Sequence, residues 1–263
     1  MIKAMYTSAT GMKVQQTNVD VIANNLANVN TTGFKRQQVE FQDLLYLTLN
    51  KPGTSTAQGS PAPNGTQIGG GARLTAVSKL FTTGNLEETK DPLHVAIEGD
   101  GFFEVQLPDG SQAFTRDGSF AIDANGALVT SEGFQVQPQI TFPPDVSGIR
   151  IGVDGTVSVV TASSPNQAQE LAQMQLTRFV NPSGLENLGS NLLRETAASG
   201  TPIQSTPGIN GVGGIRQGFL ERSNVEVVNE LVNLITAQRA YEVNSRVIRT
   251  SDNMLSTANQ IIR

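Results

Sequence analysis

Apolar side chains recur at heptad spacing at both ends of the chain, and this feature constrains the fold most. Steps of three and four residues near the N-terminus pass through eight positions, of which one is polar: Ile2, Met5, Ala9, Met12, Gln16, Val19, Ala23 and Leu26. Near the C-terminus, residues at every seventh position are apolar: Val227, Leu234, Tyr241, Ile248, Leu255 and Ile262. Such stripes are typical of coiled-coil helices. We therefore predict helices over residues 1–30 and 223–263 that pair as one coiled-coil domain.

The outer faces of these predicted helices are unusually poor in charge. Between Met1 and Phe34 only Lys3, Lys13 and Asp20 are charged. A second apolar stripe lies beside the first in the C-terminal segment: Ala240, Val247, Met254 and Ile261. Burial of one stripe stabilises less than the ordering of so long a segment costs. We therefore expect the terminal segments to be largely disordered in a monomer and to become helical when copies assemble. A self-contained helical stalk is the alternative.

Both predicted helices carry signals at their inner ends. Ser223 and Glu226 have the spacing of a capping box, which predicts that the second helix starts there. Four amides gather where the first helix ends: Asn24, Asn25, Asn28 and Asn30. Amides both donate and accept hydrogen bonds, so we hypothesise that they satisfy helix-end carbonyl groups and neighbouring subunits. Gly33 is expected to end this helix, because glycine adopts left-handed backbone conformations readily.

The middle of the chain reads as strands separated by tight turns. Asp-Gly or Asn-Gly pairs begin at residues 100, 109, 117, 125 and 154, and such pairs favour hairpin turns. Residues 73–200 are therefore predicted to form an antiparallel β-rich domain, which makes the fold class α+β. Residues 50–72 hold six glycines, three prolines and one charge. We assign 31–72 together with 201–222 to an extended connecting region that includes this glycine- and proline-rich arm.

Composition argues against several kinds of function. A net charge of −5 and a pI near 5.0 disfavour nucleic-acid binding, and the lack of cysteine excludes disulfides and thiol nucleophiles. His94 is the only histidine. Asp109, Asp117, Asp123 and Asp154 fit turns better than pairs of catalytic carboxylates. We predict no catalytic site, cofactor or metal. No run of 18 apolar residues predicts a transmembrane segment, and the first residues do not resemble a cleaved signal peptide.

Four stretches carry a family resemblance. Residues 23–36, ANNLANVNTTGFKR, resemble the N-terminal signature of bacterial flagellar rod and hook proteins, and residues 218–248 resemble the C-terminal signature. Residues 96–120 and 178–192 are similar to the β-domain of that family. The resemblance thus covers nearly the whole chain.

The resemblance implies a structural subunit, not an enzyme, that stacks helically with copies of itself around a central channel. The length, the FTRDGSF turn and the segment after Phe41 are more similar to the distal-rod members than to the hook protein. The implied location is the basal-body rod that crosses the periplasm, reached through the type III export apparatus without a cleaved signal. The implied partners are proximal rod and hook subunits and the ring proteins of the peptidoglycan layer and outer membrane.

Other functions stay open at this point. The chain could be a proximal-rod or hook-type subunit of the same family. Two alternatives from other classes are a secreted β-domain that binds glycan or protein on a helical stalk, and a cell-wall hydrolase.

On the rod interpretation, the terminal helices supply the subunit contacts and the arm sets the stiffness. The expected assembly residues come from the two apolar stripes and the amide cluster: Ile2, Met5, Met12, Val19, Leu26, Asn24, Asn25, Asn28, Val227, Leu234, Tyr241, Ile248, Leu255 and Ile262. Residues 46–72 are expected to make the assembly stiff, because an arm laid across adjacent subunits would oppose their sliding.

Overall fold

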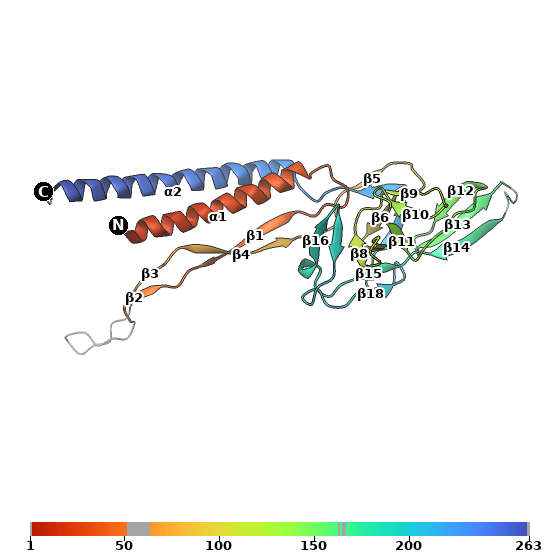
Figure 1. The fold of residues 1–263 in the computed structure, drawn as a ribbon, viewed down its shortest axis with the longest axis horizontal. Coiled ribbons are helices and arrows are strands. Elements are labelled where there is room, and N and C mark those ends of the chain that lie inside the picture. The colour runs from red at the N-terminus through yellow and green to blue at the C-terminus, as the bar shows by residue number, and fades with distance from the viewer. Residues whose placement is uncertain (1, 52–63, 163, 165–166, 262–263) are drawn as a thin grey trace. The chain divides into compact units, whose positions relative to one another are not determined.

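The computed structural model describes residues 2–51, 64–162, 164 and 167–261, and it has one long helix at each end with strands between them (Figure 1). This arrangement confirms the α+β class. The chain divides into two compact units. We call Met1–Leu26, Gln37–Ser78 and Glu226–Arg263 the helical unit, and Ala27–Arg36 with Lys79–Val225 the β-unit. Within the described residues, no helix is long and apolar enough to cross a membrane.

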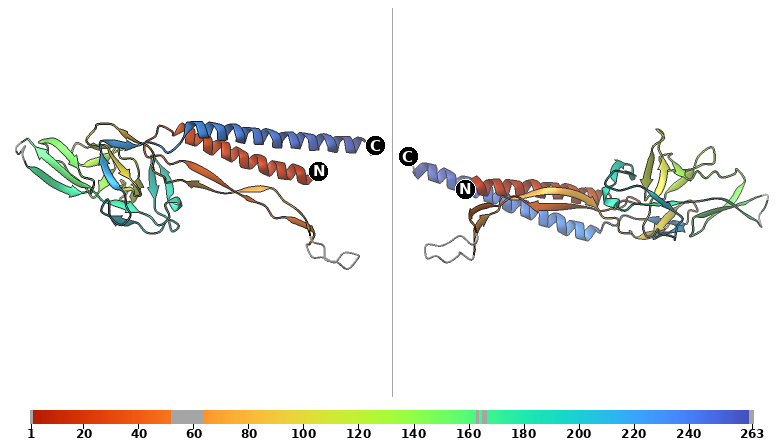
Figure 2. Two further views of the ribbon diagram at one scale, coloured as in Figure 1. Left: turned by 180° about the vertical axis from the view of Figure 1, so that it is seen from behind. Right: turned by 90° about the horizontal axis from the view of Figure 1, so that it is seen from below.

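Two helices lie side by side in the helical unit, as predicted (Figures 1 and 2). They are α1 (Ile2–Ala27) and α2 (Val227–Ile261). Gly11 on α1 faces Asn244 on α2 so closely that a Cβ at Gly11 would lie 3.0 Å from Asn244 Nδ2. The absence of a side chain on Gly11 therefore lets the two helices approach each other at this point.

The helix ends differ in part from the sequence prediction. The capping box is wrong: Ser223 Oγ accepts a hydrogen bond from the N–H of Val225 (3.2 Å), ahead of the helix, which begins at Val227. α1 ends at Ala27. Gly33 does have a positive φ of 66°, but it lies six residues beyond the end of the helix. It therefore serves a turn in the following segment.

A β-ribbon completes the helical unit. The strand β1 (Gln37–Asp43) pairs with β4 (Ala72–Lys79), and β2 (Leu47–Asn50) pairs antiparallel with β3 (Thr66–Ile68). A Cβ on Gly71 would lie 2.3 Å from Thr10 Oγ1, so the ribbon contacts α1. Within the described residues, the expected arm thus contains the paired strands β2 and β3. The middle of the arm, residues 52–63, lies outside the described residues.

The β-unit is built from short antiparallel strands. Its largest sheet has seven strands in the order β16 (Glu186–Gly189), β17 (Leu192–Arg194), β8 (Gln112–Thr115), β7 (Phe103–Gln106), β11 (Gln135–Gln137), β10 (Leu128–Thr130) and β9 (Phe120–Ile122). A second sheet has the order β12 (Val146–Ile151), β13 (Thr156–Thr161) and β14 (Ala168–Gln173). A short 3-10 helix covers Pro182–Gly184.

Three strand pairs bring residues beyond 200 into the same unit. They are β15 (Leu176–Arg178) with β18 (Ile203–Ser205), β6 (Val95–Glu98) with β19 (Gly214–Gln217), and β5 (Leu86–Glu88) with β20 (Phe219–Glu221). Residues 201–222, expected as part of a connecting region, therefore supply three strands of the β-unit. Composition hides them because each strand is only three or four residues long.

The core of the β-unit consists of two clusters. The larger one joins the sheets around fully buried side chains such as Phe103, Val157 and Leu176. The smaller one is mainly aromatic, and Phe114 stacks edge-to-face on Phe179 with ring centroids 4.8 Å apart. The predicted turns are confirmed at Asp109, Asp123 and Asp154, whose carboxylates accept hydrogen bonds from backbone N–H groups of their own turns.

Candidate functional site: assembly surface and ionic centre

Small and polar residues form specific contacts between α1 and α2, namely Gly11 with Asn244 and Asn25 with Glu230. The buried residues of α2 are Glu230, Ala237 and Ser251, and the half-buried Asn244 and Ala258 continue their seven-residue spacing. The buried residues of α1 are Ser8, Val14, Ile22 and Asn25. Few large apolar side chains are therefore buried in the two helices. Such an interface gives little hydrophobic stabilisation.

The predicted apolar stripes flank this contact instead of filling it. On α1, Ile2, Ala9, Gln16 and Ala23 are exposed. Four others on α1 are half-buried: Met5, Met12, Val19 and Leu26. On α2, Leu234, Ile248 and Leu255 are half-buried, whereas Val227 and Tyr241 are 40% and 42% exposed. Ile262 lies outside the described residues. Within one chain, these stripes are thus available for further contacts.

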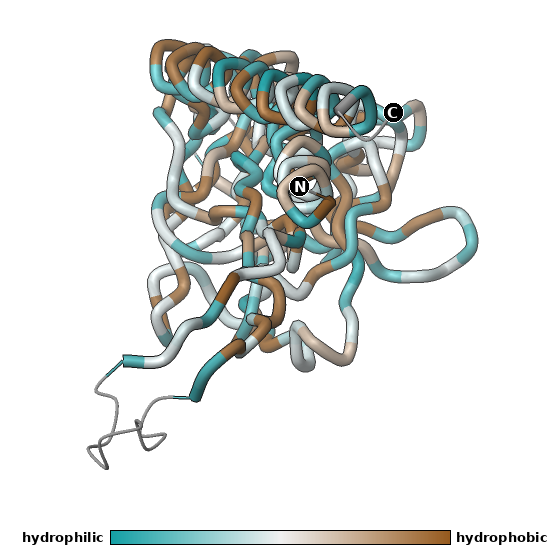
Figure 3. Tube along the Cα trace, turned by 90° about the vertical axis from the view of Figure 1, so that its left-hand side faces the viewer, coloured by the Kyte–Doolittle hydropathy of each residue, from teal (hydrophilic) through white to brown (hydrophobic). Residues whose placement is uncertain are grey.

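The helical unit carries large apolar side chains on its surface. On α2, Val228 is 73% exposed, and further exposed residues are Leu231, Val232, Ile235, Val243, Val247 and Met254. On the ribbon, Leu45 is 94% exposed, and Tyr46, Leu47, Leu49 and Ile68 are also exposed. Figure 3 shows hydrophobic positions along both α2 and the ribbon. Large exposed apolar patches are typical of sites that contact other proteins or membranes.

A groove also opens between the two helices. It has a volume of about 510 Å³ and is lined by Gln16 and Val19 of α1 and by Gln238, Tyr241 and Glu242 of α2. Three of these residues belong to or adjoin the predicted stripes. The groove therefore offers a concave contact surface on a unit that also exposes large apolar side chains.

Among the clustered amides, Asn25 has a clear structural role. Its side chain is buried and pairs with both backbone groups of Gln37: Nδ2 donates to Gln37 O (2.8 Å) and Oδ1 accepts from Gln37 N (2.8 Å). Nδ2 also lies 3.3 Å from Glu230 Oε2. Asn25 thus joins α1, β1 and α2. Asn24 is exposed and Asn28 is half-buried, so their expected role in subunit contacts stays a prediction.

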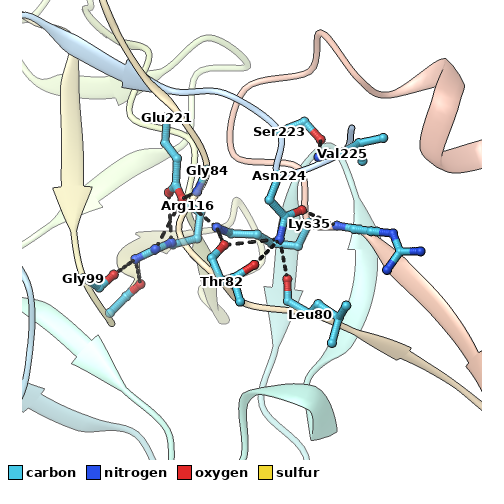
Figure 4. Close-up of polar contacts among 12 residues, drawn as sticks. Lys35, Leu80, Thr82, Gly84, Gly99, Arg116, Glu221, Ser223, Asn224 and Val225 are labelled. Atoms are coloured by element: carbon cyan, nitrogen blue, oxygen red, sulfur yellow. Dashed lines mark hydrogen bonds and ion pairs between the residues drawn. The ribbon is translucent and has the colours of Figure 1, made fainter. Parts of the chain in front are cut away.

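A buried ionic centre lies in the β-unit (Figure 4). Lys35 Nζ donates to Glu221 Oε1 (2.6 Å) and to the carbonyl oxygen of Thr82 (2.7 Å). Arg116 Nε lies 3.1 Å from Glu221 Oε2, and Arg116 Nη1 donates to the carbonyl oxygens of Gly99 and Gly101, each at 2.8 Å. All three charged side chains are at most 3% exposed. One carboxylate therefore faces two buried cations.

Burial dominates the electrostatics of this centre. It lowers the pKa of Lys35, and the nearby positive charge of Arg116 lowers it further, while Glu221 opposes the shift. Burial likewise lowers the pKa of Arg116. Arg116 Nη2 donates a long hydrogen bond to Glu221 Oε1 (3.5 Å), whereas the closer approach of Arg116 Nε to Glu221 Oε2 lacks hydrogen-bond geometry. The contact is thus an ion pair held in place by its neighbours, and the loss of Glu221 would leave two uncompensated charges.

The ionic centre continues into a network around Asn224. Its Oδ1 accepts from Arg36 N (2.7 Å), and its Nδ2 donates to Leu80 O (2.9 Å) and to Thr82 Oγ1 (2.8 Å). Leu80 N in turn donates to Arg36 O (2.9 Å). One amide side chain therefore holds three segments that are far apart in sequence.

Sequence reasoning missed the ionic centre, although its members lie in the motifs that were singled out. Lys35 belongs to ANNLANVNTTGFKR, Arg116 to FTRDGSF and Glu221 to the C-terminal signature. Each of these residues has a charged neighbour in the sequence, Arg36, Asp117 and Arg222 respectively, so charge did not single them out. Without coordinates, nothing in the sequence pairs positions so distant from one another.

Three protein-family models match the chain, and the matched regions contain Lys35, Arg116 and Glu221 respectively. The "Flagella basal body rod protein" family model matches residues 5–35, the "Flagellar hook protein FlgE/F/G D1 domain" model residues 96–159, and the "Flagellar basal body rod FlgEFG protein C-terminal" model residues 216–261. The chain is 51% identical to the flagellar basal-body rod protein FlgG of Borreliella burgdorferi, over 100% of both chains. It is 50% identical to FlgG of Buchnera aphidicola, over 99% of this chain and 100% of that one.

A solved structure is also similar, at a lower level. The flagellar hook protein FlgE2 of Helicobacter pylori matches 71% of this chain and 43% of that chain at 14% identity, with a TM-score of 0.24. This score is too low to establish a common overall arrangement.

Proposed function

Because the chain belongs to the family of flagellar basal-body rod proteins, we propose that it is a structural subunit of the distal rod. It polymerises helically with copies of itself into a straight, hollow drive shaft that transmits torque and passes export substrates. The distal assignment is supported by identity to FlgG proteins along the full length of the chains. A proximal-rod or hook-type subunit is the alternative within the family.

The observation that carries the proposal is the distribution of apolar side chains in the helical unit. A self-contained helix pair would bury its large apolar residues between the helices. Here Ala237 and Ser251 are buried, while Val228, Val232 and Ile235 are more than half exposed. Partners would cover the exposed apolar side chains, and a subunit with an apolar surface and a separate groove can bind its copies head to tail. Contacts of that kind build open helical arrays.

The partners follow from this role. Proximal rod subunits and hook subunits adjoin the ends of the rod, and ring proteins of the peptidoglycan layer and outer membrane surround it. The subunit reaches its place in the periplasm-crossing rod through the type III export apparatus, without a cleaved signal. Its role is structural and not enzymatic, in keeping with the rod-protein names of its relatives.

The β-ribbon is proposed as the stiffening element. Its exposed aliphatic residues, Leu45, Leu47 and Leu49, cannot be covered by a ribbon of two strands, and isolated two-stranded ribbons are only marginally stable. Packing across adjacent subunits would cover these side chains. It would also resist the sliding of subunits that allows a tube to bend.

Electron microscopy of the concentrated, purified protein tests the proposal. We expect straight, hollow tubes that grow in number with protein concentration. Discrete particles of fixed size at every concentration would contradict it and favour a β-domain displayed on a stalk. Zymography on cell-wall substrate, in which we expect no clearing, separates the rod role from a hydrolase.

A further inference from the structure

The chain passes between its two units four times, at 26/27, 36/37, 78/79 and 225/226. Any force that the backbone carries from the helical unit into the β-unit must enter through the residues next to these points. Inside the β-unit, these entry segments are residues 27–36, 79–85 and 221–225. The bonds between the entry segments therefore determine how such a force is distributed among these segments.

The entry segments are bonded to one another at several places. Gly33 N donates to the backbone oxygen of Glu221 (2.8 Å), and Arg222 N donates to the backbone oxygen of Asn85 (2.8 Å). Arg222 Nη1 lies 3.2 Å from Asn30 Oδ1. Together with the bonds made by Lys35 and Asn224, these contacts join every entry segment to at least one other.

Arg116 ties this group of segments to the body of the β-unit. Glu221 Oε1 accepts from both Lys35 Nζ and Gly84 N, and Glu221 Oε2 faces Arg116. Arg116 bonds the carbonyl groups on either side of Asp100 and lies over the ring of Phe102, 5.9 Å from its centroid. The entry segments are thus fastened to the strands that carry the smaller aromatic core.

We propose that Lys35, Arg116, Glu221 and Asn224 form a mechanical clamp, through which load from all the entry segments passes into the β-unit together. The inference rests on the proposed function in one respect, since only a torque-bearing subunit needs such a device. The physical reason is cooperativity. Pulling one segment free would leave buried charges unpaired, which is costly, so the segments resist a force as a group.

Single-molecule force spectroscopy on the full chain tests the clamp. The chain has no cysteine, so paired substitutions supply unique attachment points at exposed residues. Lys13→Cys with Glu132→Cys applies force across the entry segments, whereas Glu132→Cys with Gln169→Cys applies it within the β-unit. In each background we compare Asn224→Ala, Glu221→Gln and the control Glu186→Gln, which removes an exposed ion pair with Arg194.

We expect Asn224→Ala to shorten the lifetime under constant force about tenfold across the entry segments, equivalent to about 1.4 kcal/mol of barrier. The same variant should leave the lifetime within the β-unit unchanged. Glu221→Gln should have a larger effect across the entry segments, and Glu186→Gln none. Asn224→Ala decides the matter if Glu221→Gln fails to fold, because it leaves every buried charge paired.

Two outcomes would overturn the clamp: an unchanged lifetime of Asn224→Ala across the entry segments, or equal shortening in both pulling geometries, which would indicate only general stability. The measurement uses single chains, so its failure leaves tube formation untouched. Conversely, the difference between the two geometries can appear even where microscopy shows no tubes; the rod proposal then fails, and the clamp stands as a mechanical feature without the torque-bearing role.

Discussion

The charge balance around Glu221 sets the energetics of the β-unit at the scale of single residues. One buried carboxylate accepts from Lys35 and from the backbone of Gly84, and it faces Arg116. A buried ion pair of this kind is weak evidence for net stabilisation relative to apolar residues. Removal of one partner of the ion pair is nevertheless costly, because the remaining charged groups stay buried without compensation.

Replacing Glu221 by Gln should therefore reduce the free energy of unfolding by about 3–5 kcal/mol. Glutamine keeps the shape of the side chain but removes its charge, which leaves two buried cations. Urea denaturation followed by circular dichroism gives the value. The matched control, Glu186→Gln, breaks an ion pair whose side chains are 50% and 51% exposed, and should cost no more than about 1 kcal/mol. Equal effects of the two substitutions would show that the centre is unimportant for stability.

The pKa of Lys35 predicts a dependence of stability on pH. Burial lowers this pKa from its usual value of 10.5, so between the lowered value and 10.5 the unfolded chain holds a proton that the folded chain lacks. Stability should thus rise with pH across this window. Lys79 is shifted in the same direction by burial, so the comparison is with Lys35→Met, which should show a shallower rise. If stability rises equally with pH in the unsubstituted protein and in Lys35→Met, Lys35 does not cause the pH dependence.

The role of Asn25 shows what the sequence can and cannot predict about single residues. The crowding of amides near the end of α1 marks the place, because asparagine is unusual in an apolar stripe. The sequence cannot tell that Asn25 alone turns inward, since its partners, Gln37 and Glu230, belong to different elements. The ionic centre was missed for the same reason.

At the scale of secondary structure, heptad spacing predicts the two helices but not which of their faces is buried within the chain. An apolar stripe predicts that its side chains become buried, but it does not tell whether the same chain or a neighbouring one buries them. On α2, the residues buried within the chain include the small Ala237 and Ser251. The apolar heptad pattern does not contain these two residues, so it could not reveal this face. Glycine and proline content likewise concealed the paired strands of the ribbon, because pairing depends on a partner strand more than on propensity.

Replacing Leu234 or Tyr241 by Asp should abolish tube formation and leave the β-unit folded. An unpaired carboxylate in a packed apolar contact is costly, and neither residue belongs to the β-unit. Electron microscopy measures the tubes, and near-ultraviolet circular dichroism monitors the fold. Asn233→Asp introduces the same charge at an exposed polar position of α2 and serves as the control. Tubes at normal yield from either apolar-site variant would show that the stripe is misassigned.

Hydrogen exchange should distinguish the helices from the β-unit in a dilute monomer. The contact between α1 and α2 buries few large apolar side chains, so both helices should open easily when no neighbour covers them. We expect weak amide protection in α1 and α2, strong protection in β7 and β8, and a large gain in the helices on assembly. Strong protection of both helices in the monomer would mean that the pair is stable by itself.

The whole molecule combines a helical unit that needs neighbours with a β-unit that has its own core. The exposed aliphatic residues of the ribbon offer a further surface for contact, separate from the helices. Subunits could therefore polymerise through the helices and acquire stiffness separately through the ribbon. The two properties should then be separable by mutation.

Deleting residues 47–68, which include β2 and β3, should yield subunits that still polymerise but form curved or bendable tubes. The helices and the β1–β4 pair remain, whereas the contacts that oppose sliding are lost. Electron microscopy gives the curvature of the tubes. A full-length chain with serine in place of Leu45, Leu47 and Leu49 controls for length and should bend as well. Straight tubes from the deletion would remove the stiffening role, and a lack of tubes would make the ribbon necessary for assembly itself.

The helical unit draws on three separate stretches of the chain, the last of which begins at Glu226. Asn25, which pairs with the backbone of Gln37, meets Glu230 only when that last stretch is present. A product of interrupted translation could therefore fold much of its β-unit and still lack the surface through which copies join. If copies join through the helical unit, as proposed, a prematurely terminated chain would lack part of the binding surface and would be excluded from the polymer.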